Sequence, residues 1–119
     1  MPHGFNHLDM HLEGNILVKD EQVTAVLDFD DTAYSPPIVC LGYALWEVLS
    51  KDGPEMMRQY IAEYEKIRPL TSTEQDALPY VLLFRNYVIG VLDLTVWKDE
   101  KHFRRVCELE QKIVSSLKI

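Results

Sequence analysis

Residues 7–31 read HLDMHLEGNILVKDEQVTAVLDFDD, and this stretch is the most informative about the fold. Ile16–Val18 and Gln22–Asp28 are two short runs rich in apolar and β-branched residues, which favour strands. The polar residues 19–21 between them predict the turn of a β-hairpin. The second run is largely apolar, so we expect it to be well buried, with Asp28 at its end.

On either side of this hairpin the sequence changes character. Residues 1–15 are rich in His, Asp, Asn and Gly and predict a loop. Beyond Pro36 and Pro37, apolar residues recur at three- and four-residue steps, as in a helix with one apolar face. The first such stripe is Ile38, Leu41, Leu45 and Val48.

Capping patterns divide the remainder into helices. We expect Asp52 to cap a second helix with Glu55 at its third position, and Thr71 with Glu74 to form the capping box of a third. Asp99 is expected to cap the last helix. Arg68-Pro69 should end the second helix, Pro79 falls early in the third, and the last carries aligned Phe103, Val106, Glu110, Ile113 and Leu117.

The predicted fold class is therefore α+β and mostly helical: a loop and β-hairpin followed by about four helices. A chain of 119 residues suits one domain with one core. We divide that domain into residues 1–36, which carry the loop and hairpin, and residues 37–119, which are helical.

Composition limits the classes of partner. The formal net charge of −7 argues against nucleic acid, whose binding needs a basic face. No basic leader precedes an apolar run, and no apolar stretch approaches the roughly 20 residues that span a bilayer. We therefore expect a cytoplasmic protein with no membrane partner. Cys40 and Cys107 lie in apolar stretches, and we expect both to be buried free thiols.

The residues that could serve in catalysis or metal binding occur in this order along the chain: His7 and Asp9, then Asn15, then Asp28 and Asp30. Phosphoryl transfer from ATP uses one carboxylate to accept the substrate's hydroxyl proton, with an amide and a second carboxylate to hold Mg²⁺. Oxygen donors suit that hard cation. A hairpin brings Asp28 back beside the loop that carries Asp9, so the order of these residues fits such a site.

This ordered pattern resembles the kinase-like aminoglycoside phosphotransferases, choline kinases and homoserine kinases. The resemblance implies a C-terminal lobe in which Asp9 is the catalytic base and His7 braces the loop. Asn15 and Asp28 would bind the metal, and Asp30 could assist. It further implies Mg²⁺ and ATP as cofactors, and phosphoryl transfer to a hydroxyl of a small molecule. The resemblance continues from Tyr34 to Leu78-Pro79.

The sequence also departs from the family pattern. Five residues separate Asp9 from Asn15, where the family has four. Leu8 stands where the family has glycine, and Cys40 stands where it often has an aspartate that anchors the loop. The five glycines form no Gly-x-Gly, so the nucleotide-binding N-terminal lobe with its glycine-rich loop and lysine is expected to be absent, and activity of the chain alone is doubtful.

Three alternatives remain open at this stage. Asp28 and Asp30, followed by Thr32, also resemble the first motif of haloacid-dehalogenase-type phosphatases, with Asp28 as nucleophile. His3, His7 and His11 recur at steps of four and could be read as a zinc site. Lastly, the motifs could be inherited but inert, in a module that binds a partner or self-associates. We expect a homo-oligomer or an association with a missing N-terminal lobe.

Overall fold

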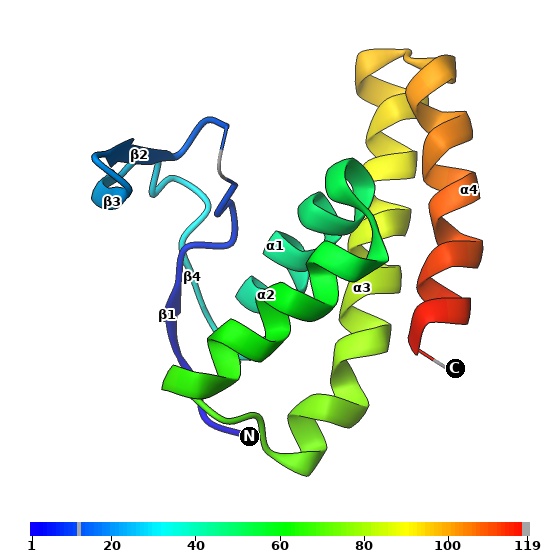
Figure 1. Cartoon of the computed structure of the whole chain (residues 1–119). Coiled ribbons are helices and arrows are strands. Elements are labelled where there is room, and N and C mark those ends of the chain that lie inside the picture. Colours follow the sequence, from blue (N-terminus) through cyan, green and yellow to red (C-terminus); the bar gives the residue numbers. More distant parts are fainter. Residues whose placement is uncertain (12, 118–119) are drawn as a thin grey trace.

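The computed structural model describes residues 1–11 and 13–117, with side chains in the last helix described up to Ser115, so Leu117 of the predicted stripe has no described side chain. The expected α+β, mostly helical class is confirmed (Figure 1). The elements are β1 (Gly4–Asn6), β2 (Ile16–Lys19), β3 (Gln22–Val26), β4 (Ala33–Ser35), α1 (Pro37–Asp52), α2 (Pro54–Ile67), α3 (Ser72–Leu92), the π-helical turn η1 (Asp93–Trp97) and α4 (Glu100–Leu117).

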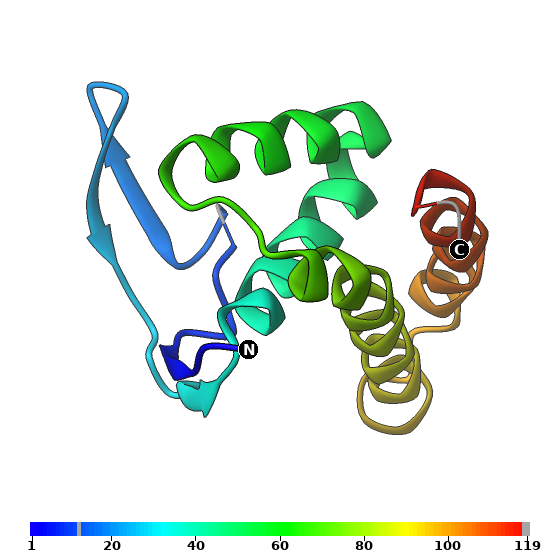
Figure 2. The ribbon, with the colours of Figure 1, turned by 90° about the horizontal axis from the view of Figure 1, so that it is seen from below.

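The predicted hairpin is present as antiparallel β2 and β3, with Ile16 opposite Val26 and a register irregularity between Leu17 and Val18. Both views show it projecting away from the helices (Figures 1 and 2). The expectation that its second strand is well buried is wrong: Val23 is 63% exposed. The apolar residues of a two-stranded sheet are covered only when another element packs on one face, and among the described residues β2 and β3 contact each other far more than they contact any helix.

A second strand pair was not expected from the sequence. Residues 4–6 form β1, which pairs antiparallel with β4 so that Gly4 lies opposite Ser35. The Asn6 side chain adds a hydrogen bond from Nδ2 to the Ser35 carbonyl at 2.7 Å. Part of the predicted N-terminal loop is therefore a strand, and the segment between the two strands is closed at its base.

The helices form the core. α1 packs against α2 and α3, and α4 packs along α3 (Figure 2). Gly42 in α1 lies so close to Val81 in α3 that a Cβ at position 42 would collide with it. The core side chains come from all four helices and the α2–α3 connection; the most buried include Ile38, Leu45, Leu49, Met57, Leu82 and Ile113.

Two predicted helix caps are confirmed. The Thr71 hydroxyl accepts from the Glu74 amide and the Glu74 carboxylate accepts from the Thr71 amide, which is the reciprocal capping box. The Asp99 carboxylate accepts from the His102 amide at 2.9 Å, at the start of α4. Short-range patterns of this kind depend on few neighbours, so the sequence predicts them well.

Other local expectations need correction. Asp52 does not cap α2: it is the last residue of α1, and Gly53, with a φ of 88°, stands at the cap position without a side chain to accept a bond. Cys107 in α4 is exposed and Cys40 in α1 is half-buried, so neither is the fully buried thiol that the sequence predicted. Pro79 lies within α3, as expected.

The segment Ser72–Trp97 is long and apolar enough, by length and composition, to cross a bilayer. This corrects the expectation that no segment approaches that length, which considered only uninterrupted apolar runs. In the fold the same segment supplies core residues such as Leu78, Leu82 and Ile89, and core helices of soluble proteins meet the same length and composition test.

Candidate active site

The loop after β1 brings Asp9 and Asn15 into direct contact. The Asn15 side-chain Nδ2 donates to the Asp9 carbonyl at 2.8 Å and to the Asp9 carboxylate at 3.0 Å. Asn15 is buried and Asp9 is partly exposed. The extra residue between them, compared with the family spacing, therefore does not keep the two side chains apart; a turn closed by the bond from the Asn15 amide to the His11 carbonyl absorbs it.

His7 is buried at the centre of this loop and links its two ends. Its Nε2 lies 2.7 Å from the Leu27 carbonyl, and its Nδ1 accepts from the Asp9 amide at 3.2 Å. Because the carbonyl can only accept, the proton sits on Nε2, and Nδ1 is left as the acceptor. The ring also packs edge-on against Phe29, with centroids 4.6 Å apart. His7 thus joins the segment of Asp9 to the segment of Asp28.

Asp28 lies directly after Leu27, whose amide donates to the Asn15 carbonyl at 2.8 Å. Its side chain is exposed, as is that of Asp30, and neither makes a hydrogen bond or ion pair to the described residues. The Asp28 backbone has a φ of 60°, a left-handed conformation that costs a non-glycine residue about 1–2 kcal/mol. Such local strain tends to occur at functional positions.

Leu8 also has a left-handed backbone, with a φ of 62°. This is the position at which the family resemblance expects glycine. The backbone conformation explains that expectation, since glycine adopts a positive φ without steric cost, and it shows that Leu8 holds the same conformation at a penalty.

The two alternative chemistries find little support. His3 approaches the Met1 carbonyl and stacks on Tyr34, whereas His7 is bonded to Leu27 and Asp9. Among residues 1–11 and 13–117, no three His, Cys, Asp or Glu side chains come together as a metal site. The described strands form two separate antiparallel pairs, which do not provide the parallel sheet that the phosphatase reading requires.

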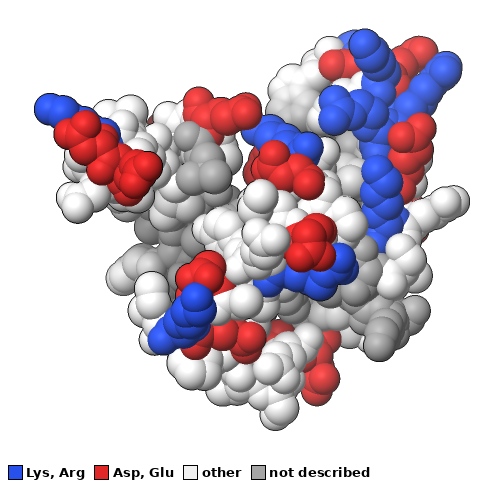
Figure 3. All heavy atoms as spheres, viewed as in Figure 1, with Lys and Arg blue, Asp and Glu red and all other residues white. Residues whose placement is uncertain are grey.

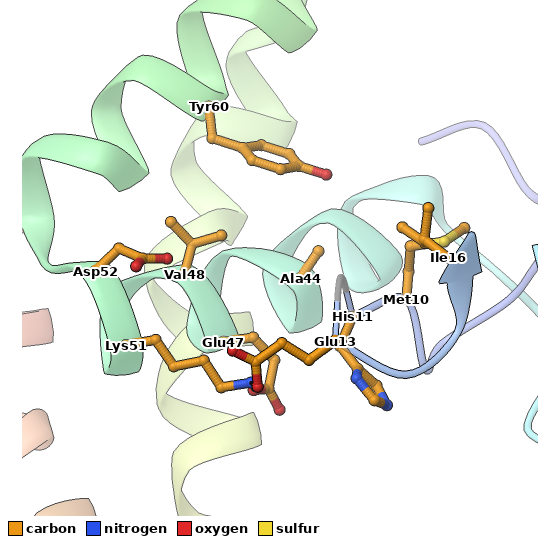
Figure 4. A pocket seen from close by; sticks show the side chains of 10 residues that line it. All are labelled: Met10, His11, Glu13, Ile16, Ala44, Glu47, Val48, Lys51, Asp52 and Tyr60. Carbon is orange, nitrogen blue, oxygen red and sulfur yellow. Dashed lines mark hydrogen bonds and ion pairs between the residues drawn. The ribbon is translucent and has the colours of Figure 1, made fainter. Parts of the chain in front are cut away.

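Two hollows adjoin the loop on the side of α1. The smaller, about 70 Å³, lies between the loop, α1 and α2 (Figure 4). There Lys51 donates to the Glu13 carboxylate at 2.9 Å, and this hydrogen bond lowers the pKa of Glu13. Lys51 also lies 3.5 Å from Glu47. The pair of Glu13 and Lys51 connects the loop to α1.

The larger hollow, a cleft of about 270 Å³, opens beside Asp9 and runs between α1, α3 and α4. Sequence reasoning identified Asp9 but not the residues across the cleft from it. Trp97 is 54% exposed and lines the cleft. Helical spacing could not reveal this, since the π-helical turn rotates Trp97 out of the register of α3. The cleft is lined by Asp9, His11, Trp46, Glu47, Ser50, Lys51, Arg85, Ile89, Trp97, His102 and Arg105.

Comparison with protein-family models identifies the family of this chain. Residues 1–77 match the model of the phosphotransferase enzyme family, and this match covers β1 through the first turns of α3. The chain belongs to the phosphotransferase enzyme family. No curated protein and no solved structure gives a significant match.

The family generally uses ATP with Mg²⁺, and the oxygen donors of this site fit such a cation. Both hydrogen-bond donors of the Asn15 amide are directed to oxygens of Asp9, so its Oδ1 remains available as a ligand. The Asp28 carboxylate is exposed and has no partner among the described residues. An amide oxygen and carboxylates are the donors that Mg²⁺ accepts in phosphotransferases.

Proposed function

We propose that this phosphotransferase transfers a phosphoryl group from ATP to a hydroxyl of a small molecule. The observation that carries the proposal is the contact between Asp9 and Asn15, held beside the Asp28 segment by His7. A base and two metal ligands within one hydrogen-bonded loop are what transfer to a hydroxyl requires.

In this proposal each residue has one role. Asp9 accepts the proton of the acceptor hydroxyl, and this residue lines the cleft in which the acceptor would lie. Asn15 and Asp28 would hold Mg²⁺, with Asp30 nearby. Bound Mg²⁺ would neutralise charge on the phosphates of ATP. His7 fixes the distance between the base and the metal ligands through its bonds to the Asp9 amide and the Leu27 carbonyl.

Binding of nucleotide tests the proposal without requiring turnover. The thermal midpoint of the chain should rise when Mg²⁺ and ATP are added together, because a ligand that binds only the folded state stabilises it. ATP with EDTA should give a smaller rise. The shift should be lost in Asp28→Ala and kept in Asp76→Ala, an exposed aspartate on α3. Each variant is compared with its own unliganded midpoint, since alanine at a φ of 60° is itself strained.

Asp9→Asn separates the base from the metal ligands. It should keep the Mg²⁺-dependent shift, since an asparagine can still accept from Asn15, while phosphoryl transfer in an active preparation falls by about 10²–10⁴-fold. Unchanged turnover in Asp9→Asn shows that the base is assigned wrongly. A folded chain with no shift under any condition shows that the motifs are inert, and partner binding then becomes the leading function.

A further inference from the structure

The cleft beside Asp9 carries an uneven distribution of charge. At the end near the loop, each lining acid has a partner: Lys51 lies beside Glu47 and also donates to Glu13, and Asp9 is bonded to Asn15 and lies 3.9 Å from His11 Nε2. Across the cleft, the charged lining residues are Arg85 of α3 and Arg105 of α4. Neither arginine has a carboxylate within ion-pair distance among the described residues, although the chain as a whole carries a net charge of −7.

Arg85 is held in place without its hydrogen bonds being satisfied. Its guanidinium carbon lies 4.6 Å from the centre of the Tyr43 ring, a cation–π contact. Its Nε is buried and has no hydrogen-bond partner in the described part of the chain. An unsatisfied buried donor is costly, and such groups in folded proteins call for a missing water, ion or ligand.

The same end of the cleft is built by an ordered turn. Asp93 is fully buried, and both its carboxylate oxygens lie 2.8 Å from His102 Nδ1. Because the carboxylate accepts, Nδ1 carries a proton, and Nε2 is the nitrogen left for the cleft. This contact spans η1 and also fixes the turn that carries the exposed Trp97. In Figure 3, basic side chains gather over the end of α3 and along α4.

We propose that the phosphoryl acceptor carries an anionic group, a carboxylate or a phosphate, in addition to its hydroxyl, and that Arg85 and Arg105 bind that group. This inference rests on the proposed function, in which the hydroxyl of the acceptor receives the phosphoryl group. Arginine pairs with a planar carboxylate, or with two oxygens of a tetrahedral phosphate, through two hydrogen bonds. The anion then sits at the far end of the cleft and the hydroxyl at Asp9, with Trp97 covering the chain between them. A volume of about 270 Å³ limits the acceptor to a small molecule.

A matched series of butyl alcohols tests the charge preference directly. The probes are 4-hydroxybutyrate, 4-hydroxybutyl phosphate, 4-amino-1-butanol and 1,4-butanediol, which share a chain and differ in the terminal charge. Binding is followed by the fluorescence of Trp97, with Trp97→Phe to identify its signal. We expect the two anions to bind at least about tenfold more tightly than the diol, as lost charge-assisted bonds imply, and the amine to bind most weakly. Comparison of the two anions decides between carboxylate and phosphate.

Neighbouring arginines on α4 supply the control. Arg105→Gln should weaken binding of the preferred anion by about tenfold, whereas Arg104→Gln, at an exposed position outside the cleft lining, should leave it unchanged. Because Arg85 packs on Tyr43, Arg85→Lys keeps the charge and tests the forked geometry. Tighter binding of the amine, or equal loss in Arg104→Gln and Arg105→Gln, overturns the inference. These titrations contain no nucleotide, so a failure here is distinct from a missing Mg²⁺–ATP shift.

Discussion

Leu8 and Asp28 have left-handed backbones on the two segments that His7 joins. Next to Leu8, the Asp9 amide donates to His7 Nδ1, and the Asp28 side chain is exposed. A single residue type with an unfavourable backbone would be a minor local cost. Two such residues, each next to a residue that is hydrogen-bonded to the buried His7, indicate that the loop geometry is imposed by its hydrogen bonds rather than by local preference.

Substitution of Leu8 measures that cost. Leu8→Gly should leave the free energy of unfolding within about 1 kcal/mol of the parent, because relief of the left-handed strain offsets glycine's greater loss of chain entropy. Leu8→Ile should lower it by about 1 kcal/mol or more, since a β-branched residue tolerates a positive φ poorly. Urea unfolding of the three proteins gives the comparison. Equal stability of the glycine and isoleucine variants would contradict the assigned backbone.

Among the helices, Glu74 is a buried residue whose hydrogen bonds connect the end of α2 to the start of α3. It is fully buried, and its carboxylate accepts from Arg68 at 2.6 Å and from the Thr71 amide and hydroxyl at 3.0 Å each. The hydrogen bond from Arg68, followed by that from the Thr71 amide, lowers the pKa of Glu74. The carboxylate is therefore charged in the folded chain at neutral pH.

The lowered pKa predicts a dependence of stability on acid. Above the unfolded-state pKa of about 4.5 the contribution of Glu74 is complete, and it is lost as the pH falls through the lower pKa of the folded state. Glu74→Gln should destabilise the chain by about 2 kcal/mol at pH 7, below the 3–5 kcal/mol of a fully buried pair because Arg68 is partly exposed. This variant should also lose part of the decline below pH 4.5. Unfolding midpoints measured from pH 3 to 7 check both.

A surface ion pair provides the matched control for that experiment. Glu63 pairs with Lys66 one turn apart on α2, and both side chains are about two-thirds exposed. Glu63→Gln should change the free energy of unfolding by no more than about 0.5 kcal/mol. A similar loss in Glu63→Gln and Glu74→Gln would mean that burial of Glu74 contributes nothing.

Local patterns predicted the helices well, and the exceptions have physical causes. Thr71 and Glu74 could be identified because a capping box involves only residues three apart. The pairing of β1 with β4 could not, since three-residue strands carry no periodic signal and their partners lie far apart in sequence. Trp97 and His102 were not predicted to line the cleft. The π-helical turn before them breaks the 3.6-residue spacing from which the helix faces were predicted. The resemblance to the family assigned Asp9 and Asn15 to one site, whereas the hydrogen bonds between their side chains were found only in the structure.

At the scale of the whole molecule, α3 and the start of η1 present a row of exposed apolar residues. These residues recur at alternating steps of four and three, the spacing of a seam between two helices. A second copy of this chain presents the same seam and can satisfy it by two-fold symmetry. The seam consists of Tyr80, Phe84, Tyr87 and Val91 of α3 and Leu94 of η1, which are 46–66% exposed. At its edge, the Tyr87 hydroxyl donates to Glu110 of α4 at 2.8 Å.

We expect the chain to self-associate through this seam. Light scattering at increasing concentration should show a dimer, and added salt should favour it by screening the repulsion between chains of net charge −7. Phe84→Glu should give a monomer. Ile67→Glu, at a position 90% exposed outside the seam, should not. A parent chain that stays monomeric at high concentration, with or without salt, contradicts the prediction.

The pairing of β1 with β4 has a consequence for how the gene can be altered. It holds residues 4 and 35 next to each other, so both ends of the segment that carries the hairpin are fixed in place. The hairpin tip at Asp20 and Glu21 lies apart from the helices. Extra residues at that tip would lengthen a loop whose closure cost grows only with the logarithm of its length. The tip is thus the natural point at which a fluorescent reporter, or a whole foreign domain, can be spliced into this chain.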